Sequence, residues 1–245
     1  KQFITNGGFA DLFTVFAKVD GEKFSAFLVE RAYPGVSTGA EEHKLGIKGS
    51  STTQLILEDV VVPADNLLGE LGLGHRIAFN ILNVGRLKLG AAALGGAREC
   101  LEFAVKYASD RKQFQTPLVE FGAVQRKIAD MAVRIYVAAS ASYRTAGLID
   151  RRIDAIDPKA DDYDKQVIKA IEEYTIEQSI VKVFGTETLD YVVDESLQML
   201  GGYGFVADYP LERHYRDSRI NRIFEGTNEI NRLLIPATMM KRVMT

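Results

Sequence analysis

Cysteine and histidine are both scarce in this 245-residue chain, and each shortage argues against a class of site. The one cysteine, Cys100, has no partner for an intrachain disulfide, which fits a reducing compartment. The histidines His43, His75 and His214 are scattered, and no two of them have the spacing of metal ligands. We therefore predict neither a disulfide framework nor a metal site.

An excess of one charge and long apolar runs are also lacking. The net formal charge is −3, which gives no electrostatic basis for binding nucleic acid. No apolar run approaches membrane-spanning length, so we predict no transmembrane segment, and no signal peptide opens the chain. A P-loop, a serine nucleophile elbow and a zinc motif are missing as well. What is present is 47% hydrophobic residues, enough for a packed core.

The first quarter of the chain has the pattern of β-structure. The β-rich runs 12–19 and 23–30 flank the turn Asp20-Gly21, which predicts a hairpin. The run 52–62 is a further strand candidate, ended by Pro63. Residues 1–8 have the pattern of a strand that runs into a turn, and no initiator methionine precedes them. We therefore expect the chain to be a piece of a longer polypeptide.

From about residue 70 onward the apolar residues recur at helical spacing. Two helices are indicated by the apolar sets Leu94, Ala97, Leu101, Ala104, Ala108 and Leu118, Phe121, Val124, Ile128, Met131, Ile135. Residues 151–162 are polar and hold Pro158, so they are predicted to be a loop. Further helices are predicted over about 167–184, 189–200 and 227–242, with Gly201-Gly202 ending the second of these. The fold class predicted is α+β, mostly α, in which a partial β-domain precedes an antiparallel helical bundle.

One carboxylate has the surroundings of a general base. Glu225 follows Ile223 and Phe224 and precedes Gly226-Thr227-Asn228, which are turn and cap formers. It is therefore predicted to lie at a loop-to-helix junction beside apolar side chains, where a carboxylate can act as a base. An ordinary surface glutamate before a helix is the alternative.

Two other features leave alternatives open. Residues 202–207 match the G-x-G-x-x-[GA] fingerprint, but they follow a helical pattern, and Pro210 comes before a new helix can open, which argues against a Rossmann site. Gly201 and Gly202 are either a helix C-cap or a place where backbone approaches a phosphate or ring. Arg111, at the end of a helix, either caps that helix and meets solvent or grips a phosphate.

The ordered segments ITNG (4–7), RKQF (111–114), QMLGGYGF (198–205) and FEGTNEI (224–230) resemble the second half of the acyl-CoA dehydrogenase family. The resemblance runs from residue 1 to about residue 242. It implies that residues 1–65 are the later part of a middle β-barrel domain and residues 66–245 a C-terminal four-helix domain. It also implies oxidation of acyl-CoA thioesters to trans-2-enoyl-CoA with FAD in fatty-acid β-oxidation, and electron transfer to electron-transfer flavoprotein.

The resemblance assigns roles by position. Glu225 matches the base that removes the α-proton, and Arg86, Phe224 and Gly226 match substrate contacts. Gly85 stands where some relatives carry their glutamate, so the base assignment is not ambiguous. Phe3 stands where the family usually has tryptophan. The cofactor contacts implied are Phe3, Thr5, Arg111, Gln113, Phe114, Gln198, Gly201, Gly202, Thr227 and Glu229.

Several further expectations come from the family. The contacts made by Arg111 and Gln198 cross to a neighbouring subunit, which implies a homodimer or homotetramer. The compartment implied is the bacterial cytoplasm or the mitochondrial matrix. The family's N-terminal helical domain has no counterpart here, so we expect these 245 residues alone to bind FAD poorly and to turn over no substrate. The alternatives are an acyl-CoA oxidase that uses oxygen and a catalytically idle scaffold. A surface position is the alternative for Arg86.

Overall fold

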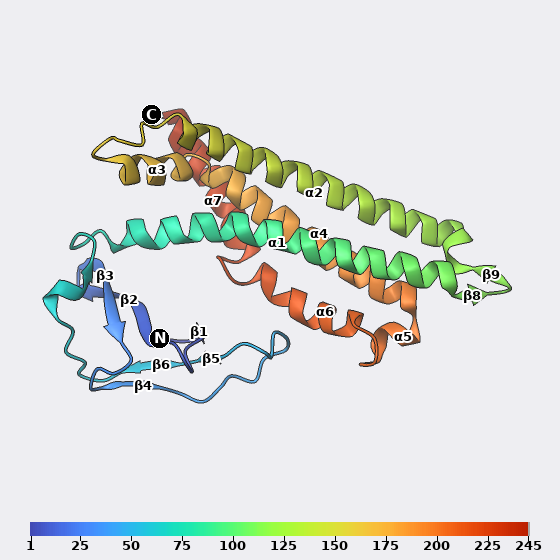
Figure 1. Cartoon of the computed structure of the whole chain (residues 1–245), viewed down its shortest axis with the longest axis horizontal. Helices are drawn as coiled ribbons and strands as arrows, with labels where there is room; N and C mark the ends of the chain where they lie inside the picture. Colours follow the sequence, from blue (N-terminus) through green and yellow to red (C-terminus); the bar gives the residue numbers. More distant parts are fainter. Residues whose placement is uncertain (245) are drawn as a thin grey trace. The chain divides into compact units, whose positions relative to one another are not determined.

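The computed structural model describes residues 1–244 and divides the chain into two compact units, Lys1–Ile81 and Leu82–Thr245 (Figure 1). The strands of the first unit are short apart from one hairpin, and the second unit is almost entirely helical. The predicted class, mostly helical with some antiparallel strands, is therefore confirmed. No closed barrel forms among residues 1–244.

The hairpin in the first unit has the predicted bounds. Strands β2 (Leu12–Val19) and β3 (Lys23–Glu30) pair antiparallel over their whole length. A two-residue turn can join these strands because Asp20 and Gly21 both adopt positive φ, +53° and +75°. Strand β3 also pairs with β7 (Leu67–Leu68), which follows the 3₁₀ turn η1 (Ala64–Asn66).

The predicted strand over residues 52–62 is wrong. Two short strands replace it: β5 (Thr52–Thr53) pairs with β1 (Ile4–Thr5), and β6 (Leu55–Leu57) pairs with β4 (Val36–Thr38). The chain changes partner at Gln54 and no strand continues beyond Leu57. An apolar run indicates that a segment is buried, but it does not indicate with how many other strands the segment pairs.

Three long helices dominate the second unit, and the first turns of the first helix belong to the first unit. They are α1 (Gly74–Asp110), α2 (Gly122–Asp154) and α4 (Thr175–Leu200), and α4 packs against α2 (Figure 1). The backbones of α1 and α4 come into close contact at Gly90 and Gly185. A Cβ at Gly90 would lie 2.7 Å from the Val181 carbonyl oxygen, and one at Gly185 would lie 2.9 Å from the Gly90 carbonyl oxygen.

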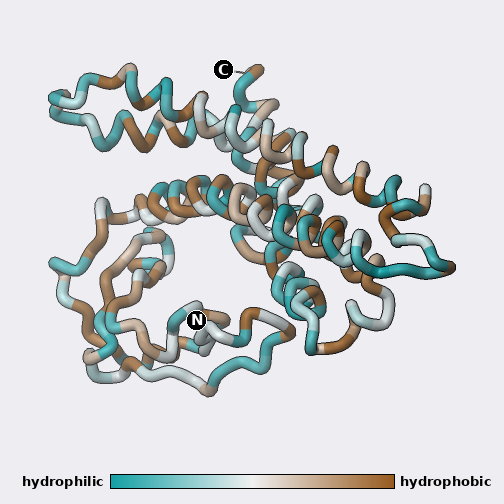
Figure 2. The backbone as a smooth tube through the Cα atoms, turned by 45° about the vertical axis from the view of Figure 1, so that its right-hand side comes forward, coloured by the Kyte–Doolittle hydropathy of each residue, from teal (hydrophilic) through white to brown (hydrophobic). Residues whose placement is uncertain are grey.

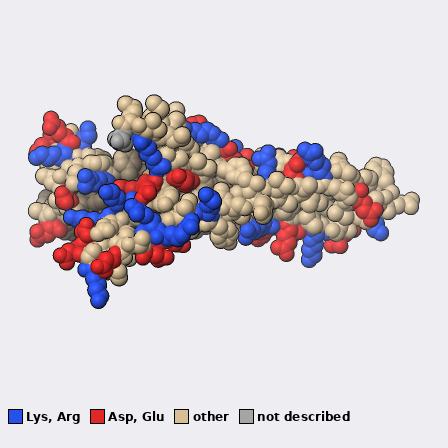
Figure 3. All heavy atoms as spheres, turned by 90° about the horizontal axis from the view of Figure 1, so that it is seen from above, with Lys and Arg blue, Asp and Glu red and all other residues tan. Residues whose placement is uncertain are grey.

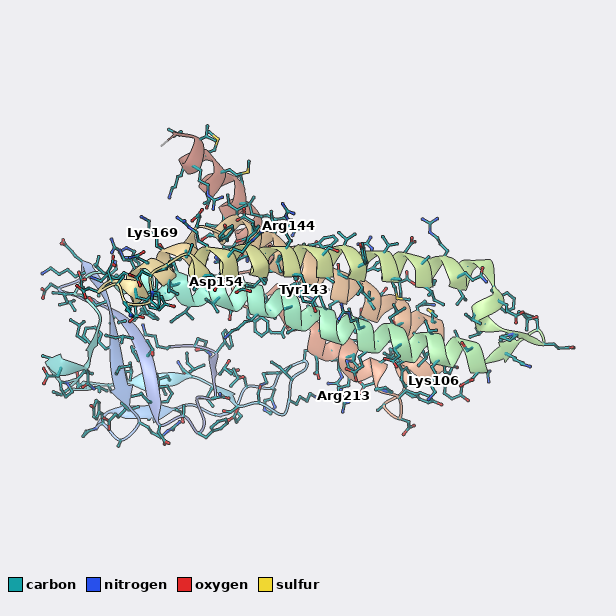
Figure 4. All side chains as sticks on the ribbon, turned by 45° about the horizontal axis from the view of Figure 1, so that its top comes forward. Lys106, Tyr143, Arg144, Asp154, Lys169 and Arg213 are labelled. Carbon is teal, nitrogen blue, oxygen red and sulfur yellow. The ribbon has the colours of Figure 1, made fainter. Side chains whose placement is uncertain are left out.

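Two of the predicted helix boundaries are wrong. The helix α2 continues to Asp154, so the loop begins later than residue 151; Figure 4 labels Asp154 at this end and Lys169 on α3 (Tyr163–Glu172). The following break falls at Glu173 and Tyr174, before α4, whereas we placed it near Gly185. Gly185 lies within α4 because its missing side chain lets α1 approach.

The segments between the long helices hold elements that the sequence did not indicate. Strands β8 (Lys112–Gln113) and β9 (Thr116–Pro117) form a small hairpin, and the 3₁₀ turn η2 (Leu118–Glu120) covers what we read as the start of α2. After α4, which ends at Leu200 as predicted, come α5 (Gly202–Phe205), α6 (Leu211–Ser218) and the 3₁₀ turn η3 (Arg219–Arg222). A one-turn helix therefore does open before Pro210. The last helix is α7 (Asn228–Met244).

Helix α1 is long and apolar enough, by length and composition alone, to span a membrane, with a mean hydropathy of 1.2 over its most apolar 18 residues. Our sequence expectation missed this. Ala97, Cys100 and Ala104 of α1 are 0% exposed in the core of the second unit, and 28% of that 18-residue stretch is buried. Apolar and polar positions are interleaved along the helices in Figure 2, and acidic and basic side chains intermingle on the face in Figure 3.

Candidate active site

Glu225 lies in a short loop between η3 and α7, with a backbone conformation that only nearby contacts can maintain. Its φ is +58° and that of the next residue, Gly226, is +77°. A left-handed glutamate is unfavourable by about 1–3 kcal/mol unless its surroundings fix it. Asn228 and Asn231, one turn apart at the start of α7, are 2% and 0% exposed, so the loop is anchored directly beside the core.

The carbonyl oxygens of this loop are held by three buried side chains. Asn231 Nδ2 donates to Gly226 O at 2.8 Å and to Thr227 O at 3.1 Å. Arg86 Nε donates to Glu225 O at 3.3 Å, and Lys182 Nζ donates to Gly226 O at 2.8 Å. The backbone N–H of Glu225, by contrast, donates to no group among residues 1–244. The loop thus turns its acceptors inward and leaves the N–H of Glu225 available, together with those of Gly226 and Thr227.

The Glu225 carboxyl group occupies the space above Gly85. A Cβ at Gly85 would lie 2.9 Å from Glu225 Oε1 and closer still to Oε2. Oε2 is buried and accepts no hydrogen bond from the described residues. Because Oε2 is buried, the other oxygen of this half-buried carboxylate, Oε1, is the one suited to accept a proton from another molecule. Gly85 therefore leaves room for the carboxylate itself.

Arg86 is a core residue. It is 4% exposed, which excludes the surface position, and its Nη1 donates to Asn83 Oδ1 at 3.0 Å. Burial lowers the pKa of Arg86, and the nearby Glu225 carboxylate opposes that shift. Because a guanidinium stays charged in proteins, Arg86 places a fixed positive charge beside the loop.

A second buried cation lies behind the loop, and the sequence reading missed it. Lys182 is 0% exposed and its Nζ donates to Asn228 Oδ1 at 2.6 Å as well as to the Gly226 carbonyl. Asn228 Nδ2 in turn donates to Thr186 Oγ1 at 3.2 Å and to Glu187 Oε1 at 3.1 Å. The available signal was a lysine inside the apolar run 180–184 of a helix.

The remaining sequence-predicted residues near Glu225 have structural roles at the start of α7. Thr227 Oγ1 accepts a hydrogen bond from Ile230 N at 3.3 Å, which is an N-cap. The pKa of the Glu229 carboxyl is lowered, first by a hydrogen bond from its own backbone N–H and then by one from the Thr227 hydroxyl. Phe224 is 39% exposed, so it flanks the base without covering it.

A separate pocket of about 630 Å³ lies where α4 ends. Arg111 is among its lining residues and its guanidinium carbon lies 5.9 Å from the centre of the Tyr203 ring. The structure thus brings together five of the predicted cofactor residues: Arg111, Gln113, Gln198, Gly201 and Gly202. The lining shares no residue with the Glu225 loop.

The other five predicted cofactor residues are not part of that pocket: Thr227 and Glu229 lie beside Glu225, and Phe3, Thr5 and Phe114 lie elsewhere. Phe114, with φ +50°, is 88% exposed at the tip of the β8–β9 hairpin. Phe3 and Thr5 belong to the first unit, where Phe3 is 68% exposed with φ +55°. Thr5, in β1, lines a pocket of about 480 Å³ beside Ile4 and Asn6.

Family models match most of the chain. The model described as acyl-CoA dehydrogenase, C-terminal domain, matches residues 72–240, and the one described as acyl-CoA dehydrogenase, middle domain, matches residues 1–60.

Individual relatives give the same result. A probable acyl-CoA dehydrogenase of Bacillus subtilis (strain 168) is 56% identical over 100% of this chain and 41% of its own length. The very long-chain specific acyl-CoA dehydrogenase of Rattus norvegicus is 40% identical over 96% of this chain and 34% of its own. An acyl-CoA dehydrogenase from Bacillus anthracis, solved as a complex with FAD, superposes with a TM-score of 0.96 at 56% identity, covering 100% of this chain and 43% of that one.

This chain spans less than half the length of those three relatives. Because one family model alone covers residues 72–240, more than half of the 245 residues, membership does not depend on a single relative. The chain belongs to the acyl-CoA dehydrogenase family.

Proposed function

We propose that the full-length protein is an FAD-dependent acyl-CoA dehydrogenase in which Glu225 removes the α-proton of the acyl thioester. The product would be a trans-2-enoyl-CoA, and the electrons would pass to electron-transfer flavoprotein. The observation that carries the proposal is the Glu225 carboxyl group, whose Oε2 is buried and free of hydrogen bonds from residues 1–244.

The contacts around the loop account for how this chain would perform the proton transfer. A thioester α-proton is weakly acidic, so negative charge that develops on the thioester oxygen has to be stabilised. The unoccupied N–H of Glu225 is a donor suited to that oxygen. Arg86 and Asn231 donate to the Glu225 carbonyl at 3.3 and 3.4 Å and so help to fix the orientation of this residue. Placement of the base contributes about 10²–10⁴-fold to the rate.

The pocket at the end of α4 fits a dinucleotide cofactor. Arg111 offers the forked guanidinium that suits a pyrophosphate. Gly201 and Gly202 are exposed, and a Cβ at either position would meet no atom within 4 Å, so their backbone is open to a ligand. When bound, FAD would supply the acceptor for the β-hydride at its N5. The family resemblance implies that this pocket serves the FAD of a neighbouring subunit, and we therefore propose a homodimer or homotetramer.

The test uses the full-length holoprotein and its Glu225→Gln variant. Under anaerobic conditions both are titrated with acyl-CoAs of graded chain length while the flavin absorbance is followed. The proposal predicts bleaching of the flavin in the wild type and a loss of at least about 10²-fold in rate in the variant. Bleaching at the wild-type rate in Glu225→Gln would show that Glu225 is not the base. Reoxidation by electron-transfer flavoprotein, without peroxide production in air, would separate a dehydrogenase from an oxidase.

A further inference from the structure

Lys182 is a buried lysine that forms an ion pair with no carboxylate of residues 1–244. It lies in the middle of α4, is 0% exposed, and its two described partners are the uncharged oxygens of Gly226 and Asn228. Burial of an ammonium group is unfavourable unless ion pairs or several hydrogen bonds compensate, and an apolar side chain often gives equal or greater stability. The requirements of the core alone therefore do not explain a lysine at this position.

The two partners of Lys182 stand on either side of Thr227, where the loop becomes α7. One hydrogen bond, 2.8 Å long, fixes the peptide plane after Gly226, and the other, 2.6 Å long, fixes the first residue of the helix. Gly226 has φ +77°, and its carbonyl is held by two donors, Lys182 Nζ and Asn231 Nδ2, each at 2.8 Å. The residue directly before this plane is Glu225, whose own left-handed conformation depends on where Gly226 lies.

We propose that Lys182 is a positioning residue for Glu225: its ammonium group holds the Gly226 carbonyl and the Asn228 side chain, and thereby fixes the direction of the Glu225 carboxylate and N–H. The inference rests on the proposed function, because it assigns Lys182 a part in the work of that base. Lys182 itself lies under the loop and has no place among the groups that touch a substrate.

The charged groups around Lys182 come from every element packed against it. They are Arg86 from α1, Glu187 from α4, Glu225 from the loop and Glu229 from α7. The pKa of Lys182 is lowered to about 8, first by burial and then by the charge of Arg86, while the three carboxylates oppose the shift. The ammonium form is thus present below about pH 8 and is lost above it. A neutral amine donates weaker hydrogen bonds than an ammonium does, so the loop is held less firmly on the alkaline side.

A purely structural role for Lys182 makes a different prediction. If the lysine only fills space between α4 and α7, its replacement lowers the temperature of unfolding but leaves the shape of the pH–rate profile unchanged. If the lysine positions Glu225, replacement lowers kcat at saturating substrate and removes the fall in rate near pH 8. KM changes less than kcat, because Lys182 contacts no substrate.

The experiment compares full-length holoproteins carrying Lys182→Met, Lys182→Arg and the control Lys127→Met, each tested for flavin reduction by acyl-CoA across pH 8. Lys127, on α2, pairs with Glu195 of α4 away from the loop, so its loss tests stability alone. We expect Lys182→Met to lower kcat by about 10–10²-fold, the range that small misplacement of a catalytic group produces. Neither Lys182 variant should show the fall near pH 8 that the wild type shows, since methionine carries no charge and arginine keeps its charge.

The outcomes separate this inference from the proposed function. If Lys182→Met behaves like Lys127→Met in kcat and in pH profile while Glu225→Gln is inactive, the role of Lys182 is refuted and the proposed function stands. If Glu225→Gln reduces flavin at the wild-type rate, the proposed function itself fails. Should Lys182→Met not fold, Lys182→Arg decides: a fall at the same pH as in the wild type, or no fall near pH 8 in the wild type, overturns the inference.

Discussion

The loop 225–227 and the pocket at the end of α4 belong to one helical unit but are built differently. In the loop, buried side chains bind the backbone carbonyls, so the base is held from within the chain. In the pocket, Arg111, Gln113 and Gln198 are all exposed. The loop is therefore held in place by side chains of this chain, whereas the pocket is an open surface whose side chains are available to a ligand. Mutations should therefore separate the two regions cleanly.

The largest effect is expected from Gly85→Ala, which disturbs the loop that holds Glu225. The new Cβ would lie 2.9 Å from Glu225 Oε1 and closer still to Oε2, so the carboxylate has to move. Displacement by about 1 Å is expected to lower kcat for flavin reduction about 10²-fold. The matched control is Gly95→Ala on the same helix, where a Cβ meets nothing within 4 Å and turnover should be unchanged. Equal rates in the two variants would mean that Glu225 is not confined by Gly85.

A second mutation of the loop region, Arg86→Met, should lower both stability and rate. It leaves Asn83 Oδ1 buried without its donor, since Asn83 is 3% exposed and its partner is Arg86. The free energy of unfolding should fall by about 1–3 kcal/mol, measured by chemical denaturation. Arg98→Met, at an exposed position of α1, serves as the control and should be nearly neutral. A neutral Arg86→Met would contradict the support that we assign to this residue.

In the pocket, Arg111→Met should weaken FAD binding while leaving proton removal intact in protein saturated with FAD. A hydrogen bond from a charged group contributes about 1.5–3 kcal/mol, or about 10–10²-fold in the dissociation constant. Apoprotein titration with FAD measures the change, and the exposed neighbour Lys112→Met is the control. Unchanged FAD affinity in Arg111→Met would remove this pocket from the cofactor site.

The smallest effect is expected from Gly201→Ala, which tests the backbone of the pocket. Gly201 has φ +60° and ψ −134°, a conformation unfavourable for any residue with a Cβ, although the Cβ would meet nothing within 4 Å. Stability should fall by about 1–2 kcal/mol in thermal unfolding. Gly202→Ala also has open space around its Cβ but no positive φ, so it should cost less. Equal losses would show that backbone strain is not the cause.

The sequence predicted those parts of the fold that local signals determine. The hairpin 12–30 followed from two β-rich runs around Asp20-Gly21, and the end of α4 followed from Gly201. The break between the two helices before residue 200 was wrongly placed near Gly185. Sequence alone does not distinguish a glycine at which two helices cross from a glycine that ends a helix. The helices α5 and α6 were missed because glycines and Pro210 suggested only a connector.

The residues of the candidate site could be predicted from the sequence, but the contacts that hold them in place could not. The position of Glu225 at a loop-to-helix junction followed from its neighbours, and the family resemblance named Arg86. Its positive φ, the carboxylate above Gly85 and the hydrogen bonds from Lys182 and Asn231 depend on segments distant in the sequence. Nothing in the pattern of one segment specifies which carbonyl a buried lysine on another segment will bind.

The most direct measurement is an experimental structure of the full-length holoprotein with a non-reactive acyl thioester bound. We expect the Glu225 backbone N–H to donate to the thioester oxygen and a Glu225 carboxyl oxygen to lie about 3–3.5 Å from the α-carbon. A thioester bound with its α-carbon beyond reach of Glu225, and facing a different carboxylate, would contradict the account.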